Sequence, residues 1–328
     1  DAAGNVYVAG STSSVGGIMA LATTTIGPLG NTDVFVAKLS NGGKQVEFVT
    51  KIGGSALDVP TALAVDANGD IFVVGVTTSA DFPVAHAVQA ALRGVSDGFV
   101  LELDASGTAT RFATYLGGNA GDSPADLAVT AAGESIVVGS TASTDFPNDG
   151  EPQPVGAGFV TKFAVDGGSL SFSRRVEAAN AVALGPEGDV FTTGAYRNVG
   201  ALVRRSAADG STLSLVELLD TGTCVAVDAT GTAFVGGDTN SAIFVSRVDA
   251  GAAAPAYTTR FGSVDVDQDQ VVGLFDIATD GAGGAIAVGG TTGFLESVLS
   301  LHREPYTGPI TEDAATIVVR LNPSGRII

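Results

Sequence analysis

The stretch GDIFVVG at residues 69–75 consists of a glycine turn, a run of β-branched and aromatic residues, and a second glycine. This composition is typical of a short strand entered from a tight turn. The same pattern recurs as GNVYVAG at residues 4–10, GESIVVG at 133–139, GDVFTTG at 188–194, GTAFVGG at 231–237 and GGAIAVGG at 283–290. A pattern that returns along the whole chain predicts a repeat architecture.

Further strand-like segments surround the copies in a fixed order, up to three for each copy. One precedes it, as ALAVD does at residues 62–66, and two follow it, as DGFVLEL does at 97–103 and FATYLGG at 112–118. Recurring sets of four antiparallel strands predict a β-propeller, because radial repetition leaves only short, protected sheet edges. The strands of a β-sandwich do not recur in this way. We therefore predict an all-β fold, a β-propeller of four-stranded antiparallel blades, with six blades here and a seventh possible in the parent protein.

Longer segments of the repeat resemble a known family. The sequences AVDANGDIFVVGVTTSADFP at residues 64–83, DGFVLELDASG at 97–107 and ATYLGG at 113–118 are similar to the SBBP beta-propeller repeat. The resemblance covers nearly the whole chain and is most specific in the first three blades. It implies a propeller fold and a bacterial extracellular or cell-surface location, and it implies no catalytic residues.

Composition sets limits on organisation and partners. The repeats run almost end to end, so we expect residues 1–328 to form a single propeller domain. Because DAAGN at residues 1–5 matches the end of a first strand, we expect the chain to begin inside a blade of a longer polypeptide. A formal net charge of -19 disfavours nucleic acid as a partner. No stretch approaches the ~20 apolar residues of a membrane-spanning helix, so we expect no membrane insertion.

The connections between strands predict two unlike faces. First-to-second and third-to-fourth connections are tight turns rich in Gly, Asp and Asn. Second-to-third connections are long in four blades, at residues 11–32, 77–96, 140–156 and 291–314, and short in blades four and five. Long loops are often functional, so this loop-rich face is predicted to bind a protein or polysaccharide partner, with a groove at its low side. In the alternative interpretation, the loops cap blade edges and the DFP segments at 81–83 and 145–147 anchor them by burying Phe.

The predicted metal site is an acidic loop between a fourth and a first strand. Asp265, Asp267 and Asp269 alternate along the chain, so their oxygen atoms could coordinate calcium. Solvated or turn-capping acids are the competing interpretation, as for Asp58 and Asp122 in equivalent loops. No other cofactor is predicted.

Catalytic chemistry has few candidates in this sequence. Asp126 and Asp276 share one column of the innermost strand, which suggests a carbohydrate-active hydrolase or lyase with carboxylates at the channel mouth. Such enzymes hold the two carboxyl groups about 5 to 10 Å apart, and hydrogen bonding to loop amides is the competing role. The chain has two histidines and no Trp, and it lacks G-x-S-x-G and P-loop motifs.

These observations favour a non-enzymatic module with no catalytic residues. We expect an extracellular or cell-surface bacterial protein that binds a partner through its loop-rich face or contributes to a larger surface assembly. Candidate binding residues in the loops are His302, Arg303, Tyr306 and Tyr196. A charged column in the third strands is predicted to neutralise aspartates of neighbouring blades; its members are Lys38, Glu102, Lys162, Arg205, Arg247 and Arg320.

Overall fold

The structure, a computed structural model, describes residues 1–14, 16–148, 157–238, 243–261, 272–291 and 315–328. In these ranges every regular element is a β-strand except the short 3-10 helix η1 (Gly17–Leu21). The chain divides into two compact units, each described by itself below. Unit 1 comprises Asp1–Ala179 with Ala208–Gly210, and unit 2 comprises Asn180–Ala207 with Ser211–Ile328. The single-domain organisation stays a prediction.

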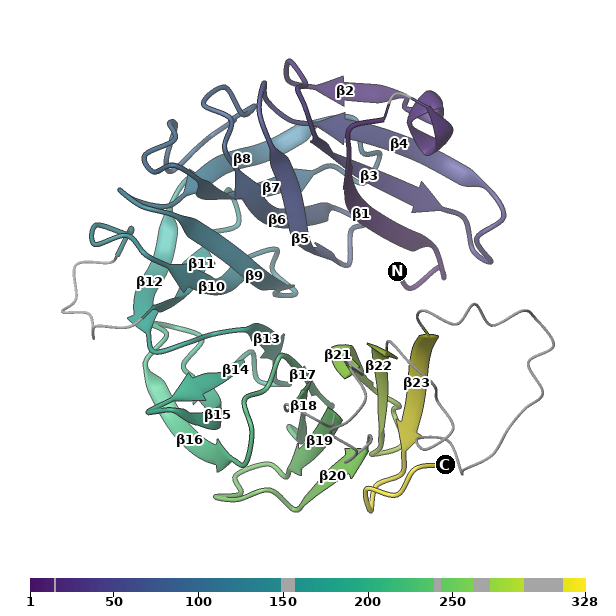
Figure 1. Ribbon diagram of the computed structural model, residues 1–328, viewed down its shortest axis with the longest axis vertical. Helices are drawn as coiled ribbons and strands as arrows, with labels where there is room; N and C mark the ends of the chain where they lie inside the picture. Colours follow the sequence, from purple (N-terminus) through teal and green to yellow (C-terminus); the bar gives the residue numbers. More distant parts are fainter. Residues whose placement is uncertain (15, 149–156, 239–242, 262–271, 292–314) are drawn as a thin grey trace, which may run out of the picture. The chain divides into compact units, whose positions relative to one another are not determined.

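Unit 1 contains three four-stranded sheets, which we call blades 1 to 3 (Figure 1). Blade 1 has the order β1 (Val6–Thr12), β3 (Asp33–Leu39), β4 (Val46–Ile52) and β2 (Thr24–Ile26). Blade 2 comprises β5 (Asp58–Val65), β6 (Ile71–Thr77), β7 (Asp97–Leu103) and β8 (Thr110–Leu116). Blade 3 comprises β9 (Asp122–Val129), β10 (Ser135–Thr141), β11 (Gly158–Phe163) and β12 (Leu170–Val176). All neighbouring strands are antiparallel except β2 and β4.

Unit 2 contains the remaining three sheets, blades 4 to 6. Blade 4 comprises β13 (Ala181–Leu184), β14 (Val190–Tyr196), β15 (Val199–Arg205) and β16 (Thr212–Leu218). Blade 5 comprises β17 (Cys224–Val227), β18 (Ala233–Asp238), β19 (Ile243–Val248) and β20 (Tyr257–Phe261). The described part of blade 6 has three strands, β21 (Val272–Thr279), β22 (Ala285–Thr291) and β23 (Ala315–Leu321). The fold is a β-propeller of antiparallel blades, six in this chain, as the repeats predict.

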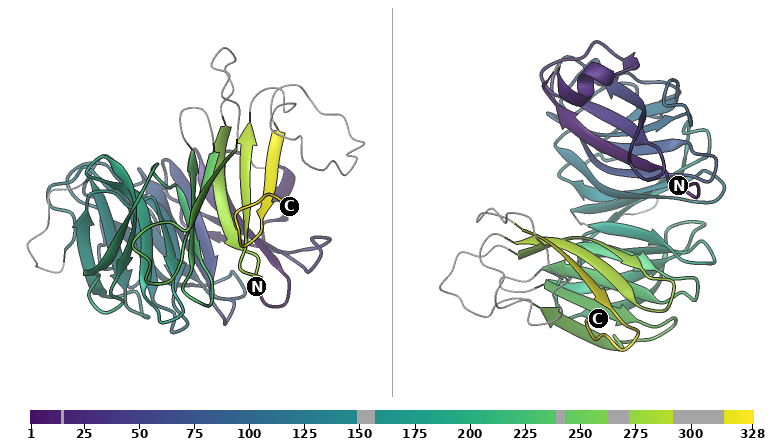
Figure 2. Two further views of the ribbon diagram at one scale, coloured as in Figure 1. Left: turned by 90° about the horizontal axis from the view of Figure 1, so that it is seen from below. Right: turned by 90° about the vertical axis from the view of Figure 1, so that its right-hand side faces the viewer.

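Within each unit the inner strands of successive blades contact one another. In unit 1, β5 contacts both β1 and β9, and in unit 2, β17 contacts both β13 and β21. Figures 1 and 2 show these strands at one edge of their sheets, and the strand at the opposite edge is β2 in blade 1 and β8, β12, β16 and β20 in blades 2 to 5. No helix among the described residues is both long and apolar enough to cross a membrane.

The first-to-second connections are tight turns, as the sequence predicts, and two of them form around an aspartate side chain in the same way. Asp66 Oδ1 accepts hydrogen bonds from the backbone N–H groups of Asn68 and Asp70, both at 2.8 Å. Asp228 Oδ1 accepts equivalent bonds from Thr230 at 2.8 Å and Thr232 at 3.0 Å. An aspartate that binds its own backbone in this way fixes a turn. The second strand of each blade therefore starts at a defined residue.

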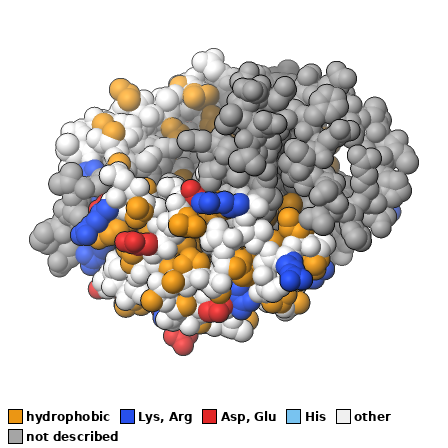
Figure 3. All heavy atoms as spheres, turned by 60° about the horizontal axis from the view of Figure 1, so that its bottom comes forward, with side chains coloured by type: hydrophobic (Ala, Val, Ile, Leu, Met, Phe, Trp, Pro, Cys, Tyr) orange, Lys and Arg blue, Asp and Glu red, His pale blue; other side chains and the backbone are white. Residues whose placement is uncertain are grey.

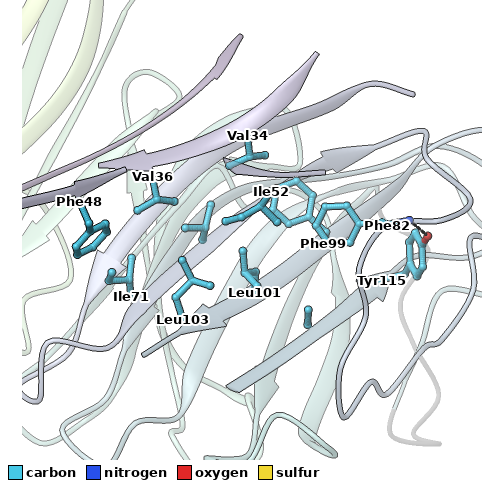
Figure 4. Packing of buried hydrophobic residues seen from close by; sticks show 12 residues of the cluster. Val34, Val36, Phe48, Ile52, Ile71, Phe82, Phe99, Leu101, Leu103 and Tyr115 are labelled. Carbon is cyan, nitrogen blue, oxygen red and sulfur yellow. Dashed lines mark hydrogen bonds between the residues drawn. The ribbon is translucent and has the colours of Figure 1, made fainter. Parts of the chain in front are cut away.

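The DFP segments anchor the loops, which confirms the interpretation based on a buried Phe. Phe82 is 3% exposed and stacks on Phe99 with ring centroids 4.8 Å apart, as the close-up in Figure 4 shows. The Tyr115 hydroxyl accepts a 3.0 Å hydrogen bond from Phe82 N. In the next blade Phe146 stacks on Phe159 at 4.6 Å. Each ring belongs to a hydrophobic cluster formed by the strands of successive blades.

The aspartates of the DFP segments tie each loop to the connection that precedes its blade. Asp81 Oδ1 accepts hydrogen bonds from Ser55 N at 2.8 Å and Ser55 Oγ at 3.0 Å. Asp145 Oδ1 accepts one from Asn119 N at 2.7 Å. The same contact is thus built twice from the same sequence pattern.

The described parts of the long loops lie along outer strands. In blade 1, β2 from the loop at residues 11–32 pairs with β4. In blade 2, Ala85 and Ala113 exchange backbone hydrogen bonds, and Tyr115 N donates to Gln89 O at 3.2 Å. In blade 3, Ser173 Oγ donates to Pro147 O at 2.7 Å. Because an open strand edge invites pairing with other chains, these loops protect the sheets. The edge-capping interpretation is confirmed for the described parts of these loops.

The charged column in the third strands differs from the sequence alignment at one position. Phe72 pairs with Glu102 and Phe234 with Arg247, but Phe191 pairs with Arg204 rather than Arg205. A shift of one residue in a strand moves a side chain to the opposite face of the sheet. Arg204 therefore belongs to the column and Arg205 does not.

The expected pairing of this column with neighbouring blades was also wrong. Lys38 pairs with Glu47 at 3.1 Å, and Lys162 pairs with Glu134 at 2.8 Å. Arg320 pairs with Asp280 at 3.0 Å. Each of these carboxylates lies in the same blade as its base, so the pairs bridge neighbouring strands and turns of one sheet.

Candidate binding site

An aromatic ring fills the space between successive blades beside the tight turns. Phe48, on the fourth strand of blade 1, pairs with Lys38 and packs against Gly107 in the third-to-fourth turn of blade 2. No Cβ would fit at Gly107 without displacing that ring. The same arrangement recurs at three other blade junctions, where Phe112 lies against Gly167, Phe172 against Gly210 and Tyr257 against Gly325.

The junction between blades 4 and 5 lacks this ring. The residue that pairs with Arg204 on the fourth strand is Ser214, in the position of Phe48, Phe112, Phe172 and Tyr257. The positive-φ glycine of the next turn is Gly251, and a Cβ there would meet nothing within 4 Å. Ser214 is exposed, whereas Phe112 and Phe172 are each 1% exposed.

A cavity of about 290 Å³ lies at this junction, entirely within unit 2. Its lining includes Ser214 and Gly251. Its floor is formed by the core between the two blades, where Phe191 is 8% exposed, Leu202 3% and Val216 4%. At the other four junctions described above, a Phe or Tyr ring lies between the positions equivalent to Ser214 and Gly251. The cavity lies beside the tight turns, on the side opposite to the predicted groove of the loop-rich face.

Charged groups surround the mouth of the cavity. Arg204 Nε donates to Asp189 Oδ2 at 2.6 Å, and Arg204 Nη2 lies 3.6 Å from Glu187 Oε2. Across the mouth, Asp249 pairs with Arg247 at 2.8 Å. The Glu187 side chain is 82% exposed and that of Asp249 is 50% exposed, so solvent reaches both carboxylates beside their arginine partners.

One further carboxylate near the mouth is held in its ionised form. Burial would raise the pKa of Asp228, but hydrogen bonds from the Thr230 hydroxyl and the Thr230 and Thr232 amides, with the charge of Arg247, lower that pKa overall. Thr230 itself lines the cavity. Figure 3 shows basic, acidic and hydrophobic side chains interspersed on the described part of one face. The site therefore combines an apolar floor with a mouth of mixed charge.

Among the described residues, no loop caps the outer strand beside the cavity. In blade 4 the two-residue turn of Arg197 and Asn198, with both residues at positive φ, joins β14 to β15. This connection is therefore too short to reach the outer edge of β16. Leu215 and Glu217 are equivalent to Ala113 and Tyr115, whose N–H groups bond to the blade 2 loop. In the described part of the chain, no segment outside the sheet forms a backbone hydrogen bond with Leu215 or Glu217.

The predicted carboxylate pair is found at equivalent positions of two sheets. Asp126 pairs with Val138 and Asp276 with Val288, each just after a β-bulge. Each carboxylate accepts a 2.8 Å hydrogen bond from the next residue's N–H. Asp126 belongs to unit 1 and Asp276 to unit 2, so their use as a catalytic couple stays a hypothesis.

Most of the other predicted site residues lie outside the described ranges, namely Asp265, Asp267, Asp269, His302, Arg303 and Tyr306. Tyr196 is described, and the Arg197 guanidinium lies 5.2 Å from the centre of its ring. The equivalent loop acid Asp58 is fully buried and accepts hydrogen bonds from Gly54 N at 2.7 Å and Ser79 Oγ at 3.0 Å. Asp58 is thus a turn cap. The described residues contain no cluster of three or more potential metal ligands.

Comparison with known families supports the repeat. Residues 44–83 match the family model of the beta-propeller repeat SBBP. This segment is therefore similar to an SBBP repeat. It runs from before β4 through β5 and β6 to the DFP segment, so it includes both the fourth strand that carries Phe48 and the buried anchor Phe82. No curated protein matches the chain.

Solved structures show the same fold around the SBBP repeat at low sequence identity. Hydrazine synthase of Kuenenia stuttgartiensis is 12% identical with a TM-score of 0.52, covering 82% of this chain and 64% of that one. A Bacteroides caccae protein of unknown function is 11% identical with a TM-score of 0.50, covering 90% and 88%. A Lactobacillus plantarum protein is 14% identical with a TM-score of 0.50, covering 90% and 76%. At such identities the likeness concerns the fold alone.

Proposed function

We propose that the chain is a non-enzymatic binding and structural module, and that it binds a protein partner at the cavity between blades 4 and 5. The observation that carries this proposal is the replacement of an aromatic ring by Ser214 opposite Gly251. Pockets with an apolar floor and a few polar groups at the mouth are the usual form of ligand sites.

The floor of the cavity favours an apolar or aromatic group over a sugar. Phe191, Leu202 and Val216 offer no hydrogen-bonding side chains, and sugars need several such partners. The four equivalent junctions hold Phe or Tyr rings, so the space has the shape of a ring. A protein side chain therefore suits the floor better than a polysaccharide does.

An extracellular or cell-surface location in bacteria belongs to the same proposal. It is supported by the SBBP repeat and by the strongly acidic charge of -19, which keeps a module from self-association and from anionic surfaces. The loop-rich face has less support as a binding surface, because its described loops cap the edges of their own blades.

Small aromatic probes test the site directly. We expect indole and p-cresol to shift the NMR signals of residues around Ser214 in a saturable way, and Ser214→Phe to abolish the shifts by filling the cavity. Ser171→Phe is the matched control, because Ser171 is exposed on an outer strand next to Phe172, where the ring already occupies the junction. Binding to neither probe, or equal binding by Ser214→Phe, would refute the proposed function.

A further inference from the structure

We infer that the partner is an extended protein segment that adds a strand to the edge of β16 and inserts an aromatic side chain into the cavity. This inference rests on the proposed function and specifies its ligand. It follows from two positions that the chain itself fills in some other blades and that no described residue fills in blade 4.

The first open position is the edge of the sheet. In blade 1 a strand from the same chain, β2, lies beside β4, and in blade 2 Ala85 and Gln89 bond to β8. Blade 4 has no equivalent segment among the described residues, and Leu213 beside this edge is 54% exposed. An exposed edge of this kind accepts an extended peptide through main-chain hydrogen bonds.

The second open position is the space for the ring. Ser214 and Val216 point to the cavity side of β16, together with their partners Arg204 and Leu202. Residues directly opposite them on an added strand share this face, with Cβ atoms about 4.5–5.5 Å away, a distance that aromatic side chains bridge. A ring on such a strand reaches the place that Phe48, Phe112, Phe172 and Tyr257 occupy from the fourth strand elsewhere.

The charges at the mouth of the cavity indicate which residues flank the aromatic side chain in the partner segment. Glu187 and Asp249 are the exposed carboxylates on either side of the cavity, and the whole chain is acidic. Residues two positions before and after the ring lie on the same face of an added strand. We therefore expect Lys or Arg at these positions. The recognised pattern is a basic residue, any residue, Phe or Tyr, any residue and a second basic residue.

A designed peptide with this pattern provides the test. Binding of an acetylated Thr-Lys-Thr-Phe-Thr-Lys-Thr amide to the whole chain is measured by isothermal titration calorimetry at low salt. We expect saturable binding that weakens at least tenfold when the peptide's Phe becomes Ala, or when the protein carries Ser214→Phe. Ser171→Phe should leave the affinity within threefold of the wild type.

N-methylated peptides separate strand addition from simple capture of the ring. Alternate N–H groups of an added strand point toward β16 and away from it. One peptide is methylated at the Lys and Phe amides and a second at the inner Thr amides. We expect one of the two to bind at least tenfold more weakly than the parent and the other to bind within threefold. Equal effects of the two patterns overturn strand addition.

The remaining outcomes are also decisive. If indole binds but the Phe peptide binds no better than its Ala version, the strand inference fails and the proposed function stands. If neither indole nor the peptide binds, both fail. If the wild type sediments as a dimer that Ser214→Phe converts to a monomer, the occupant is a second copy of this chain and the basic partner is overturned.

Discussion

Replacing Phe112 by Ser should reproduce the blade 4 arrangement between blades 2 and 3. Phe112 is 1% exposed, stacks on Phe163 with centroids 6.1 Å apart and meets Phe72 edge to face at 6.4 Å. Large-to-small changes at buried Phe positions cost about 3–5 kcal/mol when the cavity stays closed. This cavity would open beside Gly167 and admit water, which leaves mainly the transfer term of about 1.5–3 kcal/mol. Loss of the two ring pairs adds about 0.5–1.5 kcal/mol each.

We therefore expect Phe112→Ser to lower the free energy of unfolding by about 3 kcal/mol, near the lower end of the closed-cavity range. Urea titrations followed by circular dichroism measure this change, with attention to whether the slope is preserved. Leu213→Ser is the control, because Leu213 is already 54% exposed and should change stability by less than about 0.5 kcal/mol. A loss below about 1 kcal/mol for Phe112→Ser would show that the rings do not hold the blades together.

Three further changes test other parts of the fold. Burial and the charge of Asp70, opposed by Arg111, raise the pKa of Glu102 from 4.5 to about 7. Between pH 4.5 and 7 only the folded state keeps this proton, so the free energy of unfolding falls by on the order of 3 kcal/mol as the pH rises through this range. Glu102→Gln should reduce this difference in urea titrations at pH 5 and 8. The same pH dependence in the variant and the wild type would contradict the prediction. Phe82→Ala, at a residue 3% exposed, should cost about 3–5 kcal/mol and increase proteolysis of residues 77–96, and a cost like that of a surface change would argue against the anchor. Asp58→Ala leaves the Gly54, Thr77 and Ser79 donors without their acceptor and should cost about 3 kcal/mol or more in thermal melts.

The sequence predicts the strands well because each depends on local pattern. Alternating β-formers bounded by Gly, and aspartates that bind their own turn, act within a few residues of one another. The second strand at residues 69–75 and its turn at Asp66 are therefore predictable without any tertiary information. The same holds for Phe82, since a Phe in a polar loop has few stable places other than a core.

The candidate site depends on register, which local pattern does not determine. A sequence alignment matches Leu215 of LSLVELL with Phe172 of LSFSRRV, and so predicts an apolar residue in blade 4 at the position of the Phe rings. Strand pairing places Ser214 opposite Arg204 instead, ten residues further along the chain, with the same spacing and the same bulge as in blades 1 to 3. Strand pairing is needed to show that the ring is missing. The absence of Phe and Tyr from the fourth strand of blade 4 was the one signal in the sequence that pointed to it.

The hydrogen bonds from Ser55 to Asp81, which we call a clasp, have a consequence for the order in which the protein folds. The two residues are 26 positions apart, and Asn119 and Asp145 are also 26 apart. Contacts at such short separation close small loops and form early. Each clasp can form once the two inner strands between its partners have emerged, before the rest of the blade is synthesised. We expect the N-terminal blades to assemble in sequence on the ribosome, while blade 4, which has no DFP segment, waits for its neighbours.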